Sequence, residues 1–542
     1  MSPFRLSVLS ALLYGVARLS SVNAAAAIPQ NANVDNPSVQ GDTSSLPSES
    51  HVASMVKQQP ICCDALSFFL KGKVFKSSAS QYEASLQSYW SQQEQQVQPS
   101  CILIPQTVQD VQLSIFLLSV AAKYIPNGCP YAVRGGGHTP WAGAANQQGG
   151  VTIDLSKFSQ LDISKDQKQI SIGAGRRWED VYLKLDALGL ATSGGRVASV
   201  GVAGLTLGGG ISFFSPRYGL VCDNVINFQV ILASGKLVNA NAQTNADLFK
   251  ALKGGSNNFG VVTRFDMKLF TQGKFWGGFI GQDISTRQKQ YDYFVTFASS
   301  KTYDPYAALI MSFAYTLETG WYIASNFEYT KPQAYPATFK NFTDLPQTFN
   351  TMRISNLTDF TVELLGRNPP GSRELFVTAT FKNDAASMAR FFDIANATLD
   401  PFKTTPNLTV SLSYQPFPQI VTSKGFATPG NPNSGNSLGI DATRGDLTNV
   451  LLTVQWQDPA ADKNINDFAT SLFKNTEAAN KKAGTYDPYL YLNYASKQQD
   501  PIQGYGQASV NFLTSVSKKF DPLQVFQNFV PGGFKLMKTG LV

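Results

Sequence analysis

The sequence predicts an α+β protein with two domains, and three observations along the chain support this class. Up to residue 270, short strand and helix patterns alternate with glycine-rich runs. From 271 to 485, strand-like runs rich in aromatic residues, such as 275–280, 307–315 and 375–381, alternate with polar segments typical of exposed helices. This second region predicts a domain with a sheet. From 486 to 542 the glycine-rich and aromatic motifs return, and periodicity alone leaves open whether this segment rejoins the first domain.

Local patterns predict the elements of the first domain. Thr107 is a good N-cap with Asp110 three residues later, and apolar residues then recur at helical spacing as far as Ala122. A second amphipathic helix begins near Trp178 and is stopped by Gly189. The other expected elements are the hairpin strands 228–232 and 236–239, the strands 151–155, 169–172 and 261–269, and the helix 248–252.

The N-terminus has the composition of a secretory signal. Arg5 supplies positive charge, residues 6–17 are apolar, and Val22-Asn23-Ala24 resembles a small-residue cleavage site. We therefore expect a signal peptide at 1–24, a flexible tail at 25–58, and a secreted chain without a membrane span, because the apolar run is too short to cross a bilayer. In a secreted protein the four Asn-x-Ser/Thr sequons predict N-glycosylated surface loops, at Asn341, Asn356, Asn396 and Asn407.

The cysteine content fits the same oxidising compartment. Four cysteines cluster early in the ordered chain and predict one or two disulfides, namely Cys62, Cys63, Cys101 and Cys129. Cys222 is expected to be a buried thiol. No Cys-x-x-Cys pair is present and the chain has only 2 histidines, so a metal site is not expected. The net charge of +7 comes from dispersed basic residues, so nucleic acid is not an expected partner.

His138 is the one histidine available for chemistry, because the other, His51, lies in the polar N-terminal tail. It follows Gly135, Gly136 and Gly137, which let the backbone approach a ligand with no side chain in the way. A lone nucleophilic imidazole beside bare backbone suits a tethered cofactor.

The run Gly201-Val202-Ala203-Gly204-Leu205-Thr206-Leu207-Gly208-Gly209-Gly210 has two interpretations. Either tight turns bring backbone N–H groups to an anion such as a pyrophosphate, or the glycines let a helix pack tightly on a sheet. Another run, Gly435-Asn436-Ser437-Leu438-Gly439, matches a nucleophile elbow, but no histidine follows it. We interpret it as a glycine-rich loop.

Taken in order, the motifs of this chain resemble the PCMH-type flavoenzymes of the vanillyl-alcohol oxidase superfamily, and within it the berberine-bridge-enzyme-like oxidases of fungi and plants. The series covers nearly all of the chain after about residue 60 and is densest from 95 to 270. It consists of 133–138, Val151-Thr152-Ile153-Asp154-Leu155, Gly173-Ala174-Gly175 with Trp178, Gly194-Gly195-Arg196, 200–210, Tyr218-Gly219-Leu220 with Asp223-Asn224-Val225, Asn257-Asn258-Phe259-Gly260-Val261-Val262-Thr263, Tyr491-Leu492-Asn493-Tyr494, and 519–527 with Pro531-Gly532-Gly533-Phe534.

The resemblance implies an FAD-binding domain at 59–270, with a core at about 97–270, made of two α+β subdomains and completed by residues 486–542. It implies a substrate domain at 271–485, whose large antiparallel sheet, flanked by helices, covers the isoalloxazine. The residues that it implies for FAD binding are Arg134, Gly135, Gly136, Gly137, His138, Thr139, Ser199, Val200, Gly201, Gly204, Gly208, Gly209, Gly210, Asn258, Gly260, Val262 and Asn493.

The resemblance also implies a covalent bond from His138 to the 8α-methyl carbon of FAD. Many relatives add a second bond through a cysteine three residues before the position of Val200. This chain has Val197 there, so we expect a single link. In relatives a small valine at the position of Val200 leaves room for O2 beside the flavin, so the resemblance favours an oxidase; the alternative is that Val200 is simply a core residue.

With His138 used as the anchor, a Tyr, Asp, Glu or Lys must take the substrate proton while hydride passes to the flavin. Tyr491 and Tyr494 occupy the Tyr-x-Asn-Tyr motif that lines the flavin in relatives. We expect Tyr491 to be the base, Tyr494 to be the second candidate, and Asn493 to bond the flavin or the backbone. Strand alternation would place Tyr491 and Asn493 on one face and Tyr494 on the other. Middle-domain side chains that are expected to face the substrate are Gln415, Trp456 and Gln457.

The predicted function is a secreted, monomeric FAD-dependent oxidase. Its substrate would be an alcohol or an activated C–H bond of a small, secondary-metabolite-like molecule, with O2 as the electron acceptor and H2O2 as a product. A carbohydrate oxidase is one alternative, and Val197 counts against it because open sugar sites go with double attachment in relatives. A flavin-bound oxidative cyclase is another. Anaerobic bleaching of the flavin by substrate distinguishes an oxidase from a cyclase without redox chemistry.

Overall fold

The computed structural model describes residues 46–58, 62–125, 128–427, 431, 433–440 and 442–537. The expected signal peptide at 1–24 and residues 25–45 of the expected tail lie outside this part of the chain. Residues Glu49–Gln58 form helix α1, so the prediction of a flexible tail is wrong for this stretch. The polar composition concealed two residues, Val52 and Ala53, that are buried in the first core.

The first sheet has the strand order β1-β2-β4-β3, and the β2-β4 and β3-β4 pairs are parallel. Its strands are Val74–Phe75, Cys101–Leu103, Val151–Asp154 and Tyr131–Arg134, in that order. Helices α2 (Cys62–Phe69) and α5 (Val108–Tyr124) pack on this subdomain, and the expected capping box of Thr107 and Asp110 starts α5. Two disulfides, Cys62–Cys129 and Cys63–Cys101, fasten α2 to it, and Cys222 is a buried free thiol.

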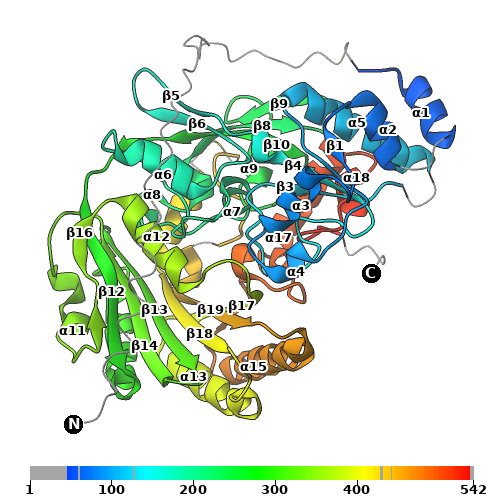
Figure 1. Cartoon of the computed structure of the whole chain (residues 1–542). Coiled ribbons are helices and arrows are strands. Elements are labelled where there is room, and N and C mark those ends of the chain that lie inside the picture. Colours follow the sequence, from blue (N-terminus) through cyan, green and yellow to red (C-terminus); the bar gives the residue numbers. More distant parts are fainter. Residues whose placement is uncertain are drawn as a thin grey trace, which may run out of the picture. The chain divides into compact units, whose positions relative to one another are not determined.

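The second sheet is antiparallel, with the order β5-β6-β10-β8-β9. Its strands are Leu161–Ile163, Gln169–Gly173, Val261–Lys268, Val225–Ile231 and Leu237–Asn241, and the last two form the expected hairpin. Helices α6 (Trp178–Asp186) and α9 (Ala246–Leu252) belong to this subdomain. The C-terminal helices α17 (Gln507–Phe520) and α18 (Val525–Asn528) share the core of the first 270 residues, and Figure 1 shows these red elements among the blue and cyan ones.

The middle of the chain forms a 9-stranded antiparallel sheet, so the predicted α+β class with a large antiparallel sheet is confirmed. Its strands, in sheet order, are β15 (Phe349–Asn350), β12 (Phe275–Asp283), β14 (Gly320–Tyr329), β13 (Ala307–Thr316), β18 (Thr409–Phe417), β19 (Leu447–Trp456), β17 (Arg373–Lys382) and β20 (Tyr486–Asp487), and β16 (Arg353–Ser355) also pairs with β12.

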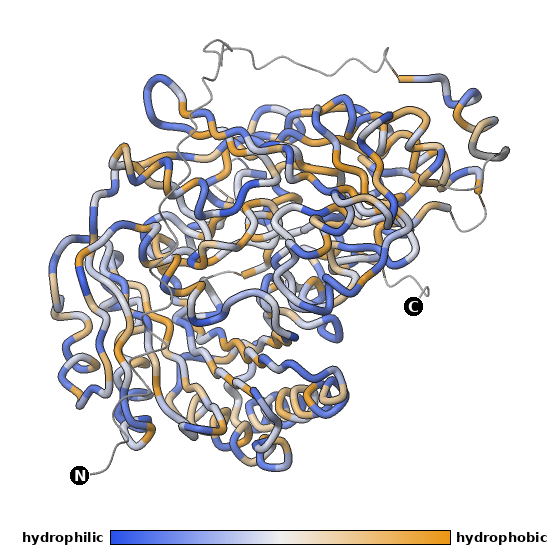
Figure 2. Tube along the Cα trace, in the orientation of Figure 1, coloured by the Kyte–Doolittle hydropathy of each residue, from blue (hydrophilic) through white to orange (hydrophobic). Residues whose placement is uncertain are grey.

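The two faces of this sheet differ because side chains alternate along each strand. On β18, Val410, Leu412 and Tyr414 belong to the second core, which the helices α10 (Arg287–Phe297), α13 (Ala385–Leu399) and α15 (Asp462–Lys482) help to form. The intervening residues Ser411 and Ser413 face the first domain. Figure 2 shows this mixture of apolar and polar residues along the strands. The sheet therefore presents a polar face to the site described below.

The sequons do not all lie in loops. Asn407 lies in a loop and is exposed, and Asn341 is exposed on the short helix α11 (Lys340–Thr343). Asn356 is the N-cap of α12 (Leu357–Arg367), and Asn396 on α13 accepts the indole N–H of Trp321 (2.8 Å). The prediction of loops is therefore wrong for two of the four sites, Asn341 and Asn396, which lie in helices. No helix in the described residues is long and apolar enough to span a membrane.

Candidate active site

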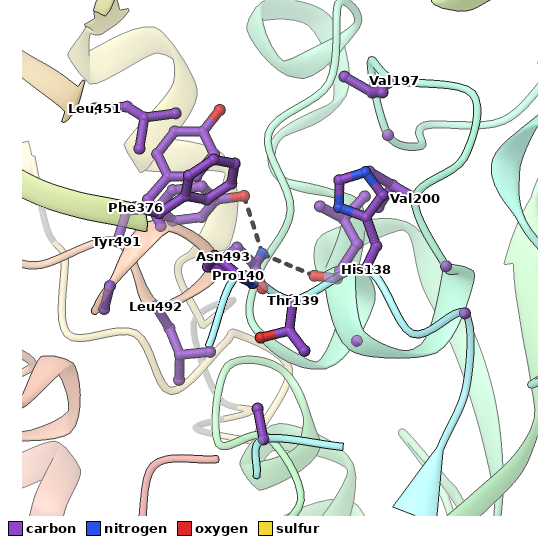
Figure 3. A pocket seen from close by; sticks show the side chains of 18 of the residues that line it. His138, Thr139, Pro140, Val197, Val200, Phe376, Leu451, Tyr491, Leu492 and Asn493 are labelled. Atoms are coloured by element: carbon purple, nitrogen blue, oxygen red, sulfur yellow. Dashed lines mark hydrogen bonds between the residues drawn. The ribbon is translucent and has the colours of Figure 1, made fainter. Parts of the chain in front are cut away.

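A cavity of about 490 Å³ lies between the glycine-rich loops of the first domain and the polar face of the nine-stranded sheet. Its wall includes residues from the loops that follow β3 and β7 (Leu190–Ala191), from strands β12, β13, β14, β17, β18 and β19, and from the C-terminal segments 491–495 and 526–534. Figure 3 shows His138 and Val200 on one side of this space and Phe376, Leu451 and Tyr491 on the other. A cavity enclosed by two domains is a usual place for a cofactor and a small substrate.

His138 lies in the cavity wall, and its imidazole stacks on the indole of Trp90, with ring centroids 4.2 Å apart and planes 10° from parallel. The backbone N–H of Trp90 donates to the carbonyl of Gly137 (3.0 Å), which holds the indole to the loop. Imidazole Nε2 is buried without a hydrogen-bond partner. Burial, and then the charge of Arg177, lower the pKa of His138 to about 3, so the ring is neutral and nucleophilic near neutral pH.

The glycines beside His138 bring two loops into backbone contact. A Cβ on Gly136 would lie 2.4 Å from the Cα of Gly201, so neither position has room for a side chain. Gly137 has a φ of +66°, a conformation that glycine adopts without strain. A Cβ on Gly204, in contrast, would meet no atom within 4 Å, although Gly204 lines the cavity. Gly204, on helix α7 (Val202–Leu207), therefore borders open space.

Most of the residues predicted to bind FAD line this cavity. They are Gly135, Gly136, Gly137, His138, Thr139, Val200, Gly201, Gly204, Gly260, Val262 and Asn493. Val197, at the position where relatives carry a second attachment, lines it as well.

The other six predicted residues lie outside the cavity wall, and three of them are the glycines described in the next paragraph. Arg134 is buried, pairs with Asp154 (3.4 Å), and lies 3.8 Å from the ring of Tyr89. Asn258 is buried and donates to the carbonyl of Phe534 (2.9 Å), which holds the C-terminal segment in place. Ser199 is buried with its hydroxyl unpartnered. The contacts of Arg134 and Asn258 organise the fold around the cavity.

The glycine run divides into two parts. Gly201 and Gly204 border the cavity, whereas Gly208, Gly209 and Gly210 do not. A Cβ on Gly208 would lie 2.1 Å from Oδ1 of Asn493, so this glycine makes room for that side chain. Gly209 and Gly210 have φ values of 108° and 82° and accept backbone N–H groups from the η2 segment Val221–Asn224 (2.8 Å each). These last three glycines therefore allow close packing, but against the Asn493 side chain and the η2 segment and not of a helix on a sheet.

Tyr491 and Tyr494 lie on a 3₁₀ turn, Leu492–Tyr494, so the expected strand alternation is wrong. Their rings meet edge to face, 4.7 Å between centroids. The Tyr491 hydroxyl accepts the backbone N–H of Ile211 (2.8 Å) and the side-chain amide of Asn493 (3.0 Å), which also donates to the carbonyl of Leu205 (3.0 Å; Figure 3). Tyr491 is 1% exposed, and burial raises its pKa above the ordinary range. Tyr491 is therefore a poor general base, because its hydroxyl is occupied and burial disfavours its anion.

Tyr494 differs from Tyr491 in that its hydroxyl contacts a cation. Its hydroxyl receives N–H groups from Arg196 (2.6 Å) and from Gln415 (3.2 Å). Arg196 also donates to Oε1 of Gln415 (2.7 Å), so the three side chains form a closed cluster. All three line the cavity. A hydrogen bond from a cation stabilises negative charge on the receiving oxygen, so this arrangement suits a proton acceptor.

The other two middle-domain candidates do not reach the cavity. Trp456 lies in the second core and donates its indole N–H to Asp462 (2.8 Å). Gln457 donates to the hydroxyl of Ser372 (3.0 Å) at the surface. Strand alternation instead directs Gln455, the neighbour of Trp456, into the cavity.

Several residues in or behind the cavity wall could not be recognised from the sequence. Trp90, which stacks on His138 behind the wall, lies between α3 (Ser80–Gln87) and α4 (Gln92–Gln95) in no recognised motif. Phe376, which lines the cavity, is one of many aromatic strand residues. Arg196 was part of a quoted motif but was not assigned a role. Its signal was visible, because it is a single cation in a run of small and apolar residues. In the described part of the chain, no group of three or more His, Cys, Asp or Glu is placed to hold a metal ion.

Comparison with known proteins agrees with this geometry. A family model described as an FAD binding domain matches residues 99–241. FAD-dependent monooxygenase CTB5 of Cercospora beticola is 37% identical over 502 residues, which cover 90% of this chain and 94% of that protein. FAD-dependent monooxygenase drtC of Aspergillus calidoustus is 35% identical over 483 residues, which cover 88% and 90%.

Solved structures share the fold at low sequence identity. BBE-like 1 of Physcomitrella patens matches with a TM-score of 0.68 and 21% identity, covering 91% of this chain and 100% of that one. The glucooligosaccharide oxidase of Acremonium strictum, described as carrying a 6-S-cysteinyl, 8α-N1-histidyl FAD, matches with a TM-score of 0.71 and 16% identity, covering 88% and 100%.

The chain thus belongs to the family of FAD-dependent oxidoreductases that includes these fungal monooxygenases, and it shares the fold of the BBE-like 1 structure. It is an FAD-linked oxidoreductase. The residues present fit this cofactor. Open space at Gly204, a cavity between two domains, and a neutral imidazole whose buried Nε2 has no partner together form a place that a bound flavin fills. A buried polar nitrogen without a partner is costly unless a ligand lies against it.

Proposed function

We propose that this protein is a secreted, monomeric oxidase of an alcohol or an activated C–H bond in a small organic molecule. One observation carries the proposal: the Arg196, Tyr494 and Gln415 cluster lies in the same cavity as His138. The FAD, when bound, accepts the hydride and passes the electrons to O2, giving H2O2.

In this proposal Tyr494 takes the substrate proton. Among the described residues, no carboxylate lies within ion-pair distance of Arg196, so its charge acts on the hydroxyl that it contacts. Gln415 is 2% exposed and holds both partners, which fixes the direction of the Tyr494 hydroxyl. Tyr494 therefore replaces Tyr491 as the preferred base. Tyr491 and Asn493 act as a support that positions the turn beside the cavity.

We also propose that His138 holds FAD through a single covalent bond to the 8α-methyl carbon. The neutral, stacked imidazole supports this, and so does the histidyl FAD of the glucooligosaccharide oxidase. That enzyme also has a cysteinyl link, whereas this chain has Val197 at the expected position. The remaining free cysteine, Cys222, is buried and does not line the cavity. A second link is therefore not expected.

The tether is tested by acid precipitation of the purified holoprotein. The wild-type pellet should stay yellow, and a peptide containing His138 should carry the mass of FAD. His138→Ala should release its flavin into the supernatant. Complete release of flavin by the wild type would show that His138 is not a covalent anchor.

The names of the relatives support a second candidate, a monooxygenase that places one oxygen atom of O2 in the product. Reaction under isotope-labelled O2 separates the two. An oxidase forms H2O2 in equal amount to the oxidised product and leaves the product unlabelled, whereas a monooxygenase labels it. Carbohydrate oxidation and oxidative cyclisation remain variants of the first proposal. Anaerobic bleaching by candidate substrates identifies which compounds reduce the flavin, and a cyclase without redox chemistry would show no bleaching.

A further inference from the structure

The wall of the active-site cavity carries positive charge and no acidic side chain. Its charged residues are Arg196 and Arg367, and none of its lining residues is Asp, Glu or Lys. Two carboxyl groups lie directly behind lining amides: Glu328 accepts from Asn326 (2.9 Å) and Glu374 accepts from Gln455 (2.8 Å). Burial raises the pKa of Glu374 to about 8 and that of Glu328 well above its ordinary value. Both acids are therefore largely neutral near pH 7 and leave the positive charge unbalanced.

Arg367 is the cation that has no partner of its own. It is the last residue of α12, is exposed, and lines the cavity. Its guanidinium lies 4.8 Å from the ring of Phe279 and 5.1 Å from that of Phe349. Among the described residues it makes no hydrogen bond or ion pair, in contrast to Arg196, which is held by Tyr494 and Gln415. Two aromatic rings fix the position of a cation without neutralising it.

Asn326 provides a second polar group, which adjoins the same phenylalanine, Phe279, as this cation does. Asn326 on β14 pairs in register with Phe279 on β12, so the two side chains are neighbours on one face of the sheet. Both line the cavity. The Oδ1 atom of Asn326 is buried and has no hydrogen-bond partner. An acceptor without a partner and a guanidinium without a counterion thus both adjoin Phe279 in one cavity wall, and a ligand that contacts both would supply what each lacks.

We propose that Arg367, Phe279 and Asn326 form a subsite for an anionic oxygen group of the substrate, with Arg367 pairing the charge and Asn326 accepting a neighbouring hydroxyl. The enzyme then selects organic substrates that carry a carboxylate or an ionised acidic hydroxyl. The inference rests on the proposed function, because it assigns the substrate class of that same cavity.

Benzoate and benzamide test the subsite, since they share a shape and differ in charge. Each is titrated into the holoenzyme while the flavin absorbance is followed. The wild type should bind benzoate about tenfold more tightly or better, as expected for a charge-assisted pair. Arg367→Gln should remove this preference and leave benzamide binding unchanged, while Arg367→Lys should keep part of it. Arg287→Gln is a matched control, because Arg287 also lies over a phenylalanine, Phe392 (5.5 Å), but does not line the cavity.

Three results would overturn the subsite: no benzoate binding by the wild type, equal binding of the two probes, or a preference that survives in Arg367→Gln. A preference lost only in Arg196→Gln would move the anion to the other arginine and would equally reject the assignment. Failure of the proposed function gives a different pattern. In that case no alcohol bleaches the flavin anaerobically, yet the benzoate preference and its dependence on Arg367 persist.

Discussion

Replacing Tyr494 by phenylalanine tests the proposed proton acceptor with little disturbance of the fold. The change removes one hydroxyl, which receives N–H groups from Arg196 (2.6 Å) and Gln415 (3.2 Å). Arg196 keeps its bond to Oε1 of Gln415 (2.7 Å), so the guanidinium is not left without a partner. The loss in stability should therefore stay at about 1–3 kcal/mol. Loss of a positioned general base slows a reaction by about 10²–10⁴, or about 2.7–5.4 kcal/mol in the barrier.

The assay is the rate of anaerobic flavin reduction in a stopped-flow instrument, with a substrate found by bleaching. Tyr494→Phe should slow this rate by at least about a hundredfold and leave the flavin content unchanged. Tyr491→Phe is the matched control. It removes the acceptor of the buried Ile211 N–H (2.8 Å). It should therefore lower the melting temperature more than Tyr494→Phe does, and slow flavin reduction less. A Tyr494→Phe rate within about threefold of wild type, or a larger loss of rate in Tyr491→Phe, would refute the assignment of the base.

Three further predictions concern His138 and the residues around it. Trp90→Ala removes the ring stacked on His138 and should lower the free energy of unfolding, measured with denaturant, by about 3–5 kcal/mol. It should also lower the amount of flavin retained in an acid pellet, whereas Trp90→Phe should retain most of the flavin. Gly136→Ala should lower the melting temperature because its Cβ would lie 2.4 Å from Gly201, whereas Gly204→Ala, with no atom within 4 Å, should fold normally and lower flavin content. Burial lowers the pKa of His138 to about 3, so the native state excludes a proton that the unfolded chain binds below its ordinary pKa of about 6.5. The stability that comes from keeping His138 neutral is complete above about pH 6.5 and is lost as the pH falls towards 3. Between about pH 7 and about pH 5, the free energy of unfolding of the flavin-free wild type should therefore fall more than that of His138→Ala.

The sequence predicted those parts of the fold that depend on local order. Helix α5 begins at the expected N-cap, and strands β8 and β9 form the expected hairpin, because capping and turn formation involve residues close in sequence. Helix α1 was missed because two apolar residues in a polar segment give no signal until a core is present to receive them. The 3₁₀ turn at Tyr491 was missed for a related reason. Its geometry depends on the partner of the Tyr491 hydroxyl, the Ile211 N–H, which lies 280 residues away in sequence.

The site was predicted in outline and not in its ranking of residues. His138 and the glycines around it could be identified, because backbone exposed by glycine next to the one usable imidazole is a local pattern. Choosing between Tyr491 and Tyr494 required knowing which hydroxyl contacts a cation, and Arg196 comes from a distant loop. Strand alternation along β19 carries a further signal. The apolar positions of β19 assign Trp456 to the core and Gln455 to the cavity from the sequence alone.

A continuous row of aromatic contacts joins the cofactor side of the cavity to the proposed base. The imidazole of His138 stacks on Trp90, Trp90 lies 5.5 Å from Phe376, and Phe376 lies 6.2 Å from Tyr494. These rings come from the flavin loop, the α3–α4 connection, strand β17 and the C-terminal turn. Each ring has few conformations and is packed on both sides, so its place is set by close packing rather than by loop geometry. The distance between the imidazole of His138 and the hydroxyl of Tyr494 is therefore determined by this row of packed rings, and Trp90 is the ring that connects His138 to strand β17.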